Sequence, residues 1–138
     1  MTGYRVTESR SRVIVVAEDH DDIRYVLKRS LERAGHRVVV AADGAAALEA
    51  IREHRPDLVV TDVDMPQMTG LDLCRAIRAD DDLRHIPVVV ASGSLMPGDK
   101  QASDAGASAT LLKPFVPAQL LALVAALLPQ TAKDGVSG

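Results

Sequence analysis

The chain has 138 residues, of which 25% are charged, and a formal net charge of -3, so it has the size and composition of one globular domain. The negative net charge disfavours direct binding to nucleic acid, and the single cysteine, Cys74, excludes an intramolecular disulfide and suits a reducing cytosol. The longest apolar run, Leu120 to Leu128, is shorter than the ~20 residues of a membrane span, so we expect a cytoplasmic protein that does not insert into membranes.

Five short apolar segments recur along the chain and are predicted to be β-strands. Most are runs of Val or Leu without polar alternation, the pattern of parallel strands that are buried on both faces of a sheet. They are Val13 to Ala17, Arg37 to Val40, Leu58 to Thr61, Val88 to Ala91 and Thr110 to Leu112.

A helix is predicted after each of these strands. Gly35 is expected to end the first helix, Asp43 to cap the second, and Pro117 to stand in the first turn of the fifth. The fourth is expected to be short, because Pro, Gly, Ser and Asp lower helix propensity there. The predicted helices cover Asp21 to Ala34, Gly44 to His54, Leu71 to Arg78, a segment within Pro97 to Asp104, and Pro117 to the residue before Pro129.

The alternation of strands and helices predicts an α/β fold with a doubly wound, five-stranded parallel sheet and helices on both faces. The folded domain is expected to span residues 12–129. Residues 1–11 carry no periodic pattern and are expected to form a flexible N-terminal extension, and residues 130–138 a disordered tail or linker.

Polar residues stand where the predicted strands end. In a doubly wound sheet the residues just past the carboxyl ends of the strands converge on one edge. Glu18 and Asp19 follow the first strand, Asp62 the third, Ser92 the fourth and Lys113 the fifth. We therefore expect three carboxylates, a hydroxyl and an ammonium group to share one site.

This set of groups predicts a phosphoryl-transfer site that binds Mg²⁺. Crowded carboxylates repel one another unless a cation lies between them, and Mg²⁺ combines carboxylate and carbonyl ligands with phosphate oxygens. Asp62 is the candidate nucleophile, since a carboxylate can form an aspartyl phosphate. Lys113 would balance the charge of the phosphoryl group, and Ser92 could donate a hydrogen bond to one of its oxygens.

Four segments together resemble the response-regulator receiver family, and in domain layout its chemotaxis-type single-domain members. They are the acid pair Glu18-Asp19 after its apolar strand, Pro56 to Pro66 followed by Gly70, Pro87 to Gly93, and Gly106 to Phe115. The resemblance covers about residues 12 to 128. It implies a flavodoxin-like receiver domain with strand order 2-1-3-4-5.

The resemblance implies a two-component phosphorylation switch. Asp62 matches the residue that accepts a phosphoryl group from a histidine kinase or a histidine phosphotransfer protein. Asp19 and Asp62 match Mg²⁺ ligands, the position of Asp64 offers its backbone carbonyl to the metal, and Glu18 matches a residue that acts through a metal-bound water. Proteins of this family catalyse their own phosphorylation from phosphohistidine and their own slower dephosphorylation.

The resemblance also assigns roles near the end of the chain. Ser92 matches the hydroxyl residue that responds to the phosphoryl group, and Lys113 matches the lysine that contacts it, before a Lys113–Pro114 peptide bond that is often cis in the family. One position departs from the pattern. The residue three before Lys113, usually aromatic, is Thr110 here, so coupling through an aromatic rotamer is absent.

The last predicted helix is unusually apolar, since Gln119 is the only polar residue from Ala118 to Leu128. The residues expected to face inward are Leu120, Val124 and Leu127. The leucines expected near or outside the edge of the buried face are Leu121, Leu123 and Leu128. We therefore predict an interface with an output partner protein, or with a second copy of the chain, over the fourth helix, the fifth strand and the fifth helix.

Other interpretations stay open. Asp62-Val63-Asp64 after an apolar strand imitates the nucleophile motif of haloacid-dehalogenase-type phosphatases, although Pro66 departs from that pattern and the chain is short for that fold. The chain could instead be one receiver domain of a larger regulator or hybrid kinase, or a receiver-like interaction module that is never phosphorylated. His20, beside the acid pair, is interpreted as a surface residue and not as a metal ligand.

Overall fold

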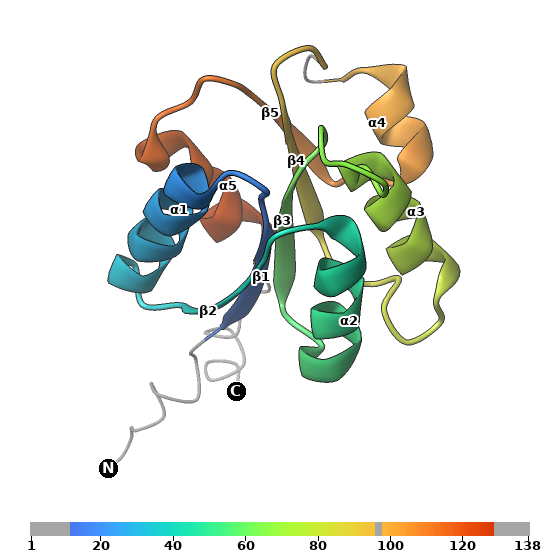
Figure 1. Cartoon of the computed structure of the whole chain (residues 1–138), viewed down its shortest axis with the longest axis horizontal. Coiled ribbons are helices and arrows are strands. Elements are labelled where there is room, and N and C mark those ends of the chain that lie inside the picture. The colour runs from blue at the N-terminus through green and yellow to red at the C-terminus, as the bar shows by residue number, and fades with distance from the viewer. Residues whose placement is uncertain (1–11, 96–97, 129–138) are drawn as a thin grey trace, which may run out of the picture.

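The computed structural model describes residues 12–95 and 98–128 and arranges them as a parallel sheet between two layers of helices (Figure 1). The sheet has the order β2-β1-β3-β4-β5, and every neighbouring pair of strands is parallel. The predicted fold class and strand order are therefore confirmed. The strands are β1 (Val13–Ala17), β2 (Arg37–Ala41), β3 (Leu58–Asp62), β4 (Val88–Ser92) and β5 (Ala109–Leu112), and the helices are α1 (Asp21–Arg33), α2 (Gly44–His54), α3 (Gly70–Ala79), α4 (Lys100–Ala105) and α5 (Pro117–Leu127).

Capping residues and a glycine, which can be recognised in the sequence, determine where several helices begin and end. Gly35 adopts a φ of 100° just after α1, and the Asp43 side chain accepts a hydrogen bond from the backbone of Ala46 at the start of α2, both as predicted. Helix α4 begins at Lys100, because the Asp99 side chain caps it. The first residue of the segment within which this helix was predicted, Pro97, and the predicted flexible segments 1–11 and 130–138 lie outside the described residues.

Apolar side chains fill the space on both faces of the sheet. Figure 1 shows α1 and α5 on one face and α2, α3 and α4 on the other. Every residue of β3 and β4 is buried, as expected for central parallel strands. Cys74 on α3 is a buried residue with a free thiol. The packed sheet therefore supports the side chains at the ends of its strands.

Helix α5 differs from its prediction. Leu128 is buried, so the prediction that it lies near or outside the edge of the buried face is wrong, whereas Leu121 and Leu123 are half-buried, as expected of residues near that edge, and pack against the core. The physical reason is that the alanines of the helix take the solvent side. Ala118, Ala122, Ala125 and Ala126 are the exposed apolar residues of α5. The interface predicted over α4, β5 and α5 stays a prediction, now without exposed leucines on α5 to support it.

Helix α1 is covered by its neighbours along only part of its apolar face. Leu27 and Leu31 are buried, whereas Ile23 and Val26, one turn nearer the start of the helix, are 38% and 49% exposed. These two residues lie at the end of the helix that adjoins the carboxyl ends of the strands. Within the described residues, none of the helices combines the length and the hydropathy needed to cross a membrane.

Candidate functional site

The predicted site residues come to one edge of the sheet. Glu18 and Asp19 follow β1, Asp62 ends β3, Ser92 ends β4 and Lys113 follows β5. Because the sheet is all parallel, these positions share its carboxyl edge. The chain thus delivers groups that are far apart in sequence to one rim.

A buried ion pair forms the centre of this rim. The Nζ of Lys113 lies 2.7 Å from Oδ1 of Asp62 and 3.7 Å from Oε1 of Glu18. Asp62 and Glu18 are only 3% and 2% exposed. Side chains from the ends of β1, β3 and β5 therefore meet, with one ammonium group between two buried carboxylates.

The electrostatics of the pair reflect this burial. Burial raises the pKa of the Asp62 carboxyl above its ordinary value, against the opposing effect of the hydrogen bond from Lys113, and the nearby charge of Glu18 raises it further. Burial alone would lower the pKa of Lys113, but its bond to Asp62 and the charge of Glu18 outweigh that effect, so the pKa of the ammonium is raised. Lys113 therefore stays charged at neutral pH.

Asp19 and His20 extend the site towards solvent. The Nδ1 of His20 lies 3.1 Å from Oε2 of Glu18 and 3.4 Å from Oδ1 of Asp19. The hydrogen bond to Glu18 and the charge of Asp19 raise the pKa of His20 above its ordinary value. His20 is exposed, as predicted, but it contacts both acids, which the sequence reasoning missed. Its position directly after the acid pair is the signal that could have indicated the contact.

The loop after β3 holds the Asp62 backbone in place. The backbone N–H of Gly70 donates to the carbonyl of Val63 over 2.9 Å, which folds the loop back on the end of the strand. A methyl group on Gly70 would collide with the carbonyl oxygen of Asp62 and lie 2.9 Å from Cα of Val63. Only glycine leaves room for this close approach. Asp64, within the same loop, is exposed.

Ser92 is fully buried at the end of the neighbouring strand. Its Oγ accepts hydrogen bonds from the backbone N–H groups of Ser94 and Leu95, each at 3.0 Å. Its backbone carbonyl accepts a hydrogen bond from the N–H of Lys113 over 2.8 Å. The Ser92 hydroxyl is thus hydrogen-bonded to the loop after β4, on the strand next to the one that carries Asp62.

The residues present fit a hard divalent cation. Glu18, Asp19 and His20 each offer one ligand atom, and these atoms lie within 4.8 Å of one another. The buried Oδ1 of Asp19 accepts no hydrogen bond within the part of the chain that the structure describes. Three carboxylates face one lysine here, so a cation would relieve their repulsion and occupy the free acceptor.

Residues 14–125 match the family described as the response regulator receiver domain. The chain belongs to this family. The response regulator MprA of Mycobacterium sp. (strain KMS) is 41% identical over 122 residues, which are 88% of this chain and 52% of that protein. The chain therefore spans about half the length of the curated relatives that it matches.

Solved structures extend the comparison. The chemotaxis protein CheY4 of Vibrio cholerae is 31% identical with a TM-score of 0.80, over 86% of this chain and 99% of that chain. The receiver domain of a sensor histidine kinase from Pseudomonas aeruginosa, solved with a magnesium ion coordinated in its active site cleft, is 28% identical. Its TM-score is 0.77, over 85% of this chain and 97% of that one. Receiver domains of this family thus occur in both regulators and kinases.

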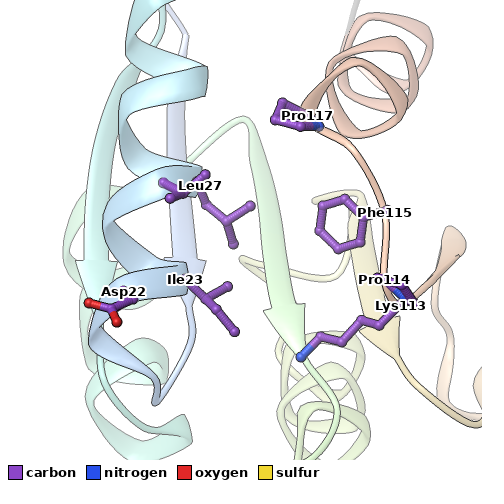
Figure 2. A pocket seen from close by; sticks show the side chains of 8 residues that line it. Asp22, Ile23, Leu27, Lys113, Pro114, Phe115 and Pro117 are labelled. Atoms are coloured by element: carbon purple, nitrogen blue, oxygen red, sulfur yellow. The ribbon is translucent and has the colours of Figure 1, made fainter.

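An apolar cleft of about 550 Å³ opens beside the site of this receiver domain. Figure 2 shows Ile23 and Leu27 of α1 facing Phe115, with the Lys113 side chain below them in the view. Val26 and Pro117 complete the apolar lining. The cleft is therefore formed by the uncovered start of α1 and by the segment that joins β5 to α5.

Two further features of the receiver domain lie in β5 and in the segment that follows it. The Lys113–Pro114 peptide bond is cis, in agreement with the resemblance. Thr110, at the position usually held by an aromatic residue, pairs with Val90 in the sheet and is half-buried. A threonine lacks the ring that would fill or vacate a pocket at this place.

Proposed function

We propose that Asp62 is the phosphoacceptor of this two-component receiver domain and that a histidine kinase or a histidine phosphotransfer protein is its donor. The main support is the 2.7 Å distance between Nζ of Lys113 and Oδ1 of Asp62, beside the acids Glu18 and Asp19. An Oδ of Asp62 forms a bond to phosphorus while the P–N bond of the phosphohistidine breaks, and the imidazole leaves as a neutral ring once it holds a proton. The same site then hydrolyses the aspartyl phosphate more slowly.

Mg²⁺ is the proposed cofactor. Asp19 and Asp62 would bind it directly, Glu18 through a water, and Asp64 through its backbone carbonyl. The buried Oδ1 of Asp19, which accepts no hydrogen bond among the described residues, and the crowding of carboxylates support this assignment. Bound Mg²⁺ supplies charge neutralisation for the carboxylates and the phosphoryl oxygens. The magnesium site of the Pseudomonas aeruginosa receiver domain points in the same direction.

Lys113 and Ser92 are proposed to stabilise the transferred group. The ammonium of Lys113 already contacts Asp62 and would pair with a phosphoryl oxygen as negative charge builds up there. Ser92 would donate its hydroxyl proton to another phosphoryl oxygen. If the hydroxyl rotates towards the phosphoryl group, it would leave the backbone N–H groups of Ser94 and Leu95, and phosphorylation would then release the start of the loop towards α4. This exchange couples the site to a partner-binding surface without an aromatic residue at Thr110.

The apolar cleft is the proposed seat of the donor. A phosphohistidine must approach Asp62 past Lys113, and the exposed parts of Ile23 and Val26 offer apolar area to the helix that carries it. Leu112 and Val116 are exposed near the predicted output interface over α4, β5 and α5. We place this exchange in the cytoplasm, without contact to nucleic acid.

Labelling with a small phosphodonor tests the proposal. With acetyl phosphate and Mg²⁺, the wild-type chain should take up about one phosphoryl group per chain in a hydroxylamine-sensitive bond. Asp62→Asn should take up none, whereas Asp81→Asn, which removes an exposed carboxylate outside the site, should be labelled like the wild type. Multiple turnover of a generic phosphate ester, without stoichiometric labelling, would instead support the haloacid-dehalogenase-type phosphatase.

A further inference from the structure

His20 contacts the acidic cluster, although its position in the fold does not require it to. It is the N-cap of α1, yet its side chain makes no capping hydrogen bond. Its ring turns to the acids instead, and its own backbone N–H donates to Oε2 of Glu18 over 3.1 Å. Glu18 already has Lys113 at 3.7 Å as a counter-charge. The ring is therefore directed at the site without serving the helix.

The spacing of the ring and the acids is that of ligands around one cation. Two ligand atoms about 2.1 Å from a metal, in neighbouring octahedral positions, lie about 3.0 Å apart. The Nδ1 of His20 lies 3.1 Å from Oε2 of Glu18 and 3.4 Å from Oδ1 of Asp19. A cation bound directly by Nδ1 of His20 and Oδ1 of Asp19, and by Glu18 through a water, would thus need these two atoms to shift by only a few tenths of an ångström, an order of magnitude that ordinary side-chain motion covers.

We infer that His20 supplies an imidazole nitrogen to the divalent cation of this site, so that the chain binds first-row transition dications in preference to Mg²⁺. The inference rests on the proposed function, because it extends the metal set proposed there. Imidazole is a poor partner for Mg²⁺ and a good one for Ni²⁺, Co²⁺ and Zn²⁺. The ligating form is the neutral ring with its proton on Nε2, so the Nδ1 proton that is donated to Glu18 in the metal-free chain would be released when the cation binds.

The ligand set explains why the effect should be selective. Carboxylates bind Mg²⁺ and transition dications alike, so removal of Asp19 would weaken both classes together. Removal of the imidazole takes away a nitrogen that only the transition dications use strongly. The 66% exposure of the His20 side chain means that the substitution leaves the core intact. Ser92, Lys113 and the Asp62 carboxylate keep their surroundings in that variant.

Metal-binding measurements on three proteins test the inference: the wild type, His20→Asn and His85→Asn. Asparagine keeps a favoured N-cap residue at position 20, and His85 is an exposed histidine outside the site. Calorimetric titration should show that His20→Asn weakens Ni²⁺ binding at least about tenfold and changes Mg²⁺ binding less than about twofold. His85→Asn should bind both ions like the wild type.

Spectroscopy gives a second readout. Pulsed electron paramagnetic resonance of the Mn²⁺-loaded wild type should detect a directly bound ¹⁴N nucleus, and the signal should vanish in His20→Asn but not in His85→Asn. Absence of this signal from the wild type, or tighter Mg²⁺ binding by His20→Asn, would overturn the inference. Stoichiometric labelling of Asp62 in Mg²⁺ then still supports the proposed function. A wild-type chain that binds Ni²⁺ through His20 but is never labelled would leave the metal ligand in place and reject the phosphoacceptor.

Discussion

The ammonium of Lys113 and the carboxylate of Asp62 lie 2.7 Å apart and join the edge strand β5 to the central strand β3. The contact is direct, although the two residues lie far apart in the sequence. Burial raises the pKa of the Asp62 carboxyl, and the positive charge of Lys113 acts in the opposite direction and lowers it. In the proposed reaction, the lysine would favour the nucleophilic form of Asp62 and pair with the charge of the phosphoryl group.

Substitution of Lys113 by Met should slow phosphorylation by acetyl phosphate about 100-fold, the scale on which removal of one charge-stabilising donor acts. The pKa of Asp62 should also rise, because the hydrogen bond that lowers it is gone. Stopped-flow or gel labelling gives the rate, and ¹³C NMR of the carboxyl carbon gives the pKa. Lys100→Met, which removes an exposed lysine paired with Asp104, is the matched control. Equal labelling rates in the two variants would contradict the role of Lys113.

Ionisation of Asp62 should make the metal-free protein less stable as the pH rises. Burial holds the folded-state pKa of Asp62 above its ordinary value of 3.8. At a pH between the ordinary pKa and the raised pKa of the folded state, Asp62 keeps its proton in the folded chain and has lost it in the unfolded chain. The free energy of unfolding therefore falls as the pH rises through this range.

Urea unfolding in a metal chelator, at steps from about pH 4 to about pH 7, measures this effect against Asp62→Asn. The stability of the wild type minus that of the variant should decrease as the pH rises, because only the wild type carries the titrating carboxyl. A difference that stays level or grows would show that Asp62 is not destabilised by burial. Added Mg²⁺ should restore wild-type stability at the upper end of the range, by mass action on the folded state.

Substitution of Gly70 by Ala should damage both stability and phosphorylation. The added methyl group collides with the carbonyl of Asp62 and crowds Val63, and backbone atoms cannot yield as the end of a flexible side chain can. We expect a loss of about 1–3 kcal/mol of unfolding free energy, the usual cost of overpacking, and slower labelling of the displaced Asp62. Gly93→Ala is the control for stability, since a methyl group there meets nothing within 4 Å. A fully stable Gly70→Ala protein would show that the loop adapts.

A charge placed in the apolar cleft should separate protein donors from small ones. Val26→Asp should lower the rate of transfer from a phosphohistidine protein at least about tenfold relative to labelling by acetyl phosphate, since burying a valine is worth about 1.5–3 kcal/mol. Tyr25→Asp is the matched control, because Tyr25 is exposed on the same helix but does not line the cleft. If both donors slow equally, or if Tyr25→Asp has the larger effect, the donor docks elsewhere.

The sequence carried enough information to predict the sheet and the edge at which the candidate site residues meet. Runs such as Val88 to Ala91 mark strands buried on both faces, and a parallel sheet then forces Glu18, Asp62, Ser92 and Lys113 to one rim. Short-range chemistry also set the helix ends at Gly35 and Asp43. These features depend on residue type and on position along the chain alone.

Other features depend on which face each helix turns towards the sheet, and the spacing of apolar residues does not determine this. On α5, almost every residue is apolar, so the pattern could not show that the alanines and not the leucines face solvent. On α1, the stripe that includes Val26 looks like a continuous core face, yet its first turn lies uncovered. The contact of His20 with both acids depends on a rotamer, and composition does not specify rotamers.

The strand order also separates the acidic and basic parts of the rim. Strands β1 and β3 are direct neighbours and deliver Glu18, Asp19 and Asp62, whereas Lys113 follows β5, the edge strand of the described sheet. A displacement of β5 would therefore remove the ammonium and leave the buried carboxylates without their counter-charge. The same ion pair that forms the centre of the rim thus also fastens the edge strand to the sheet.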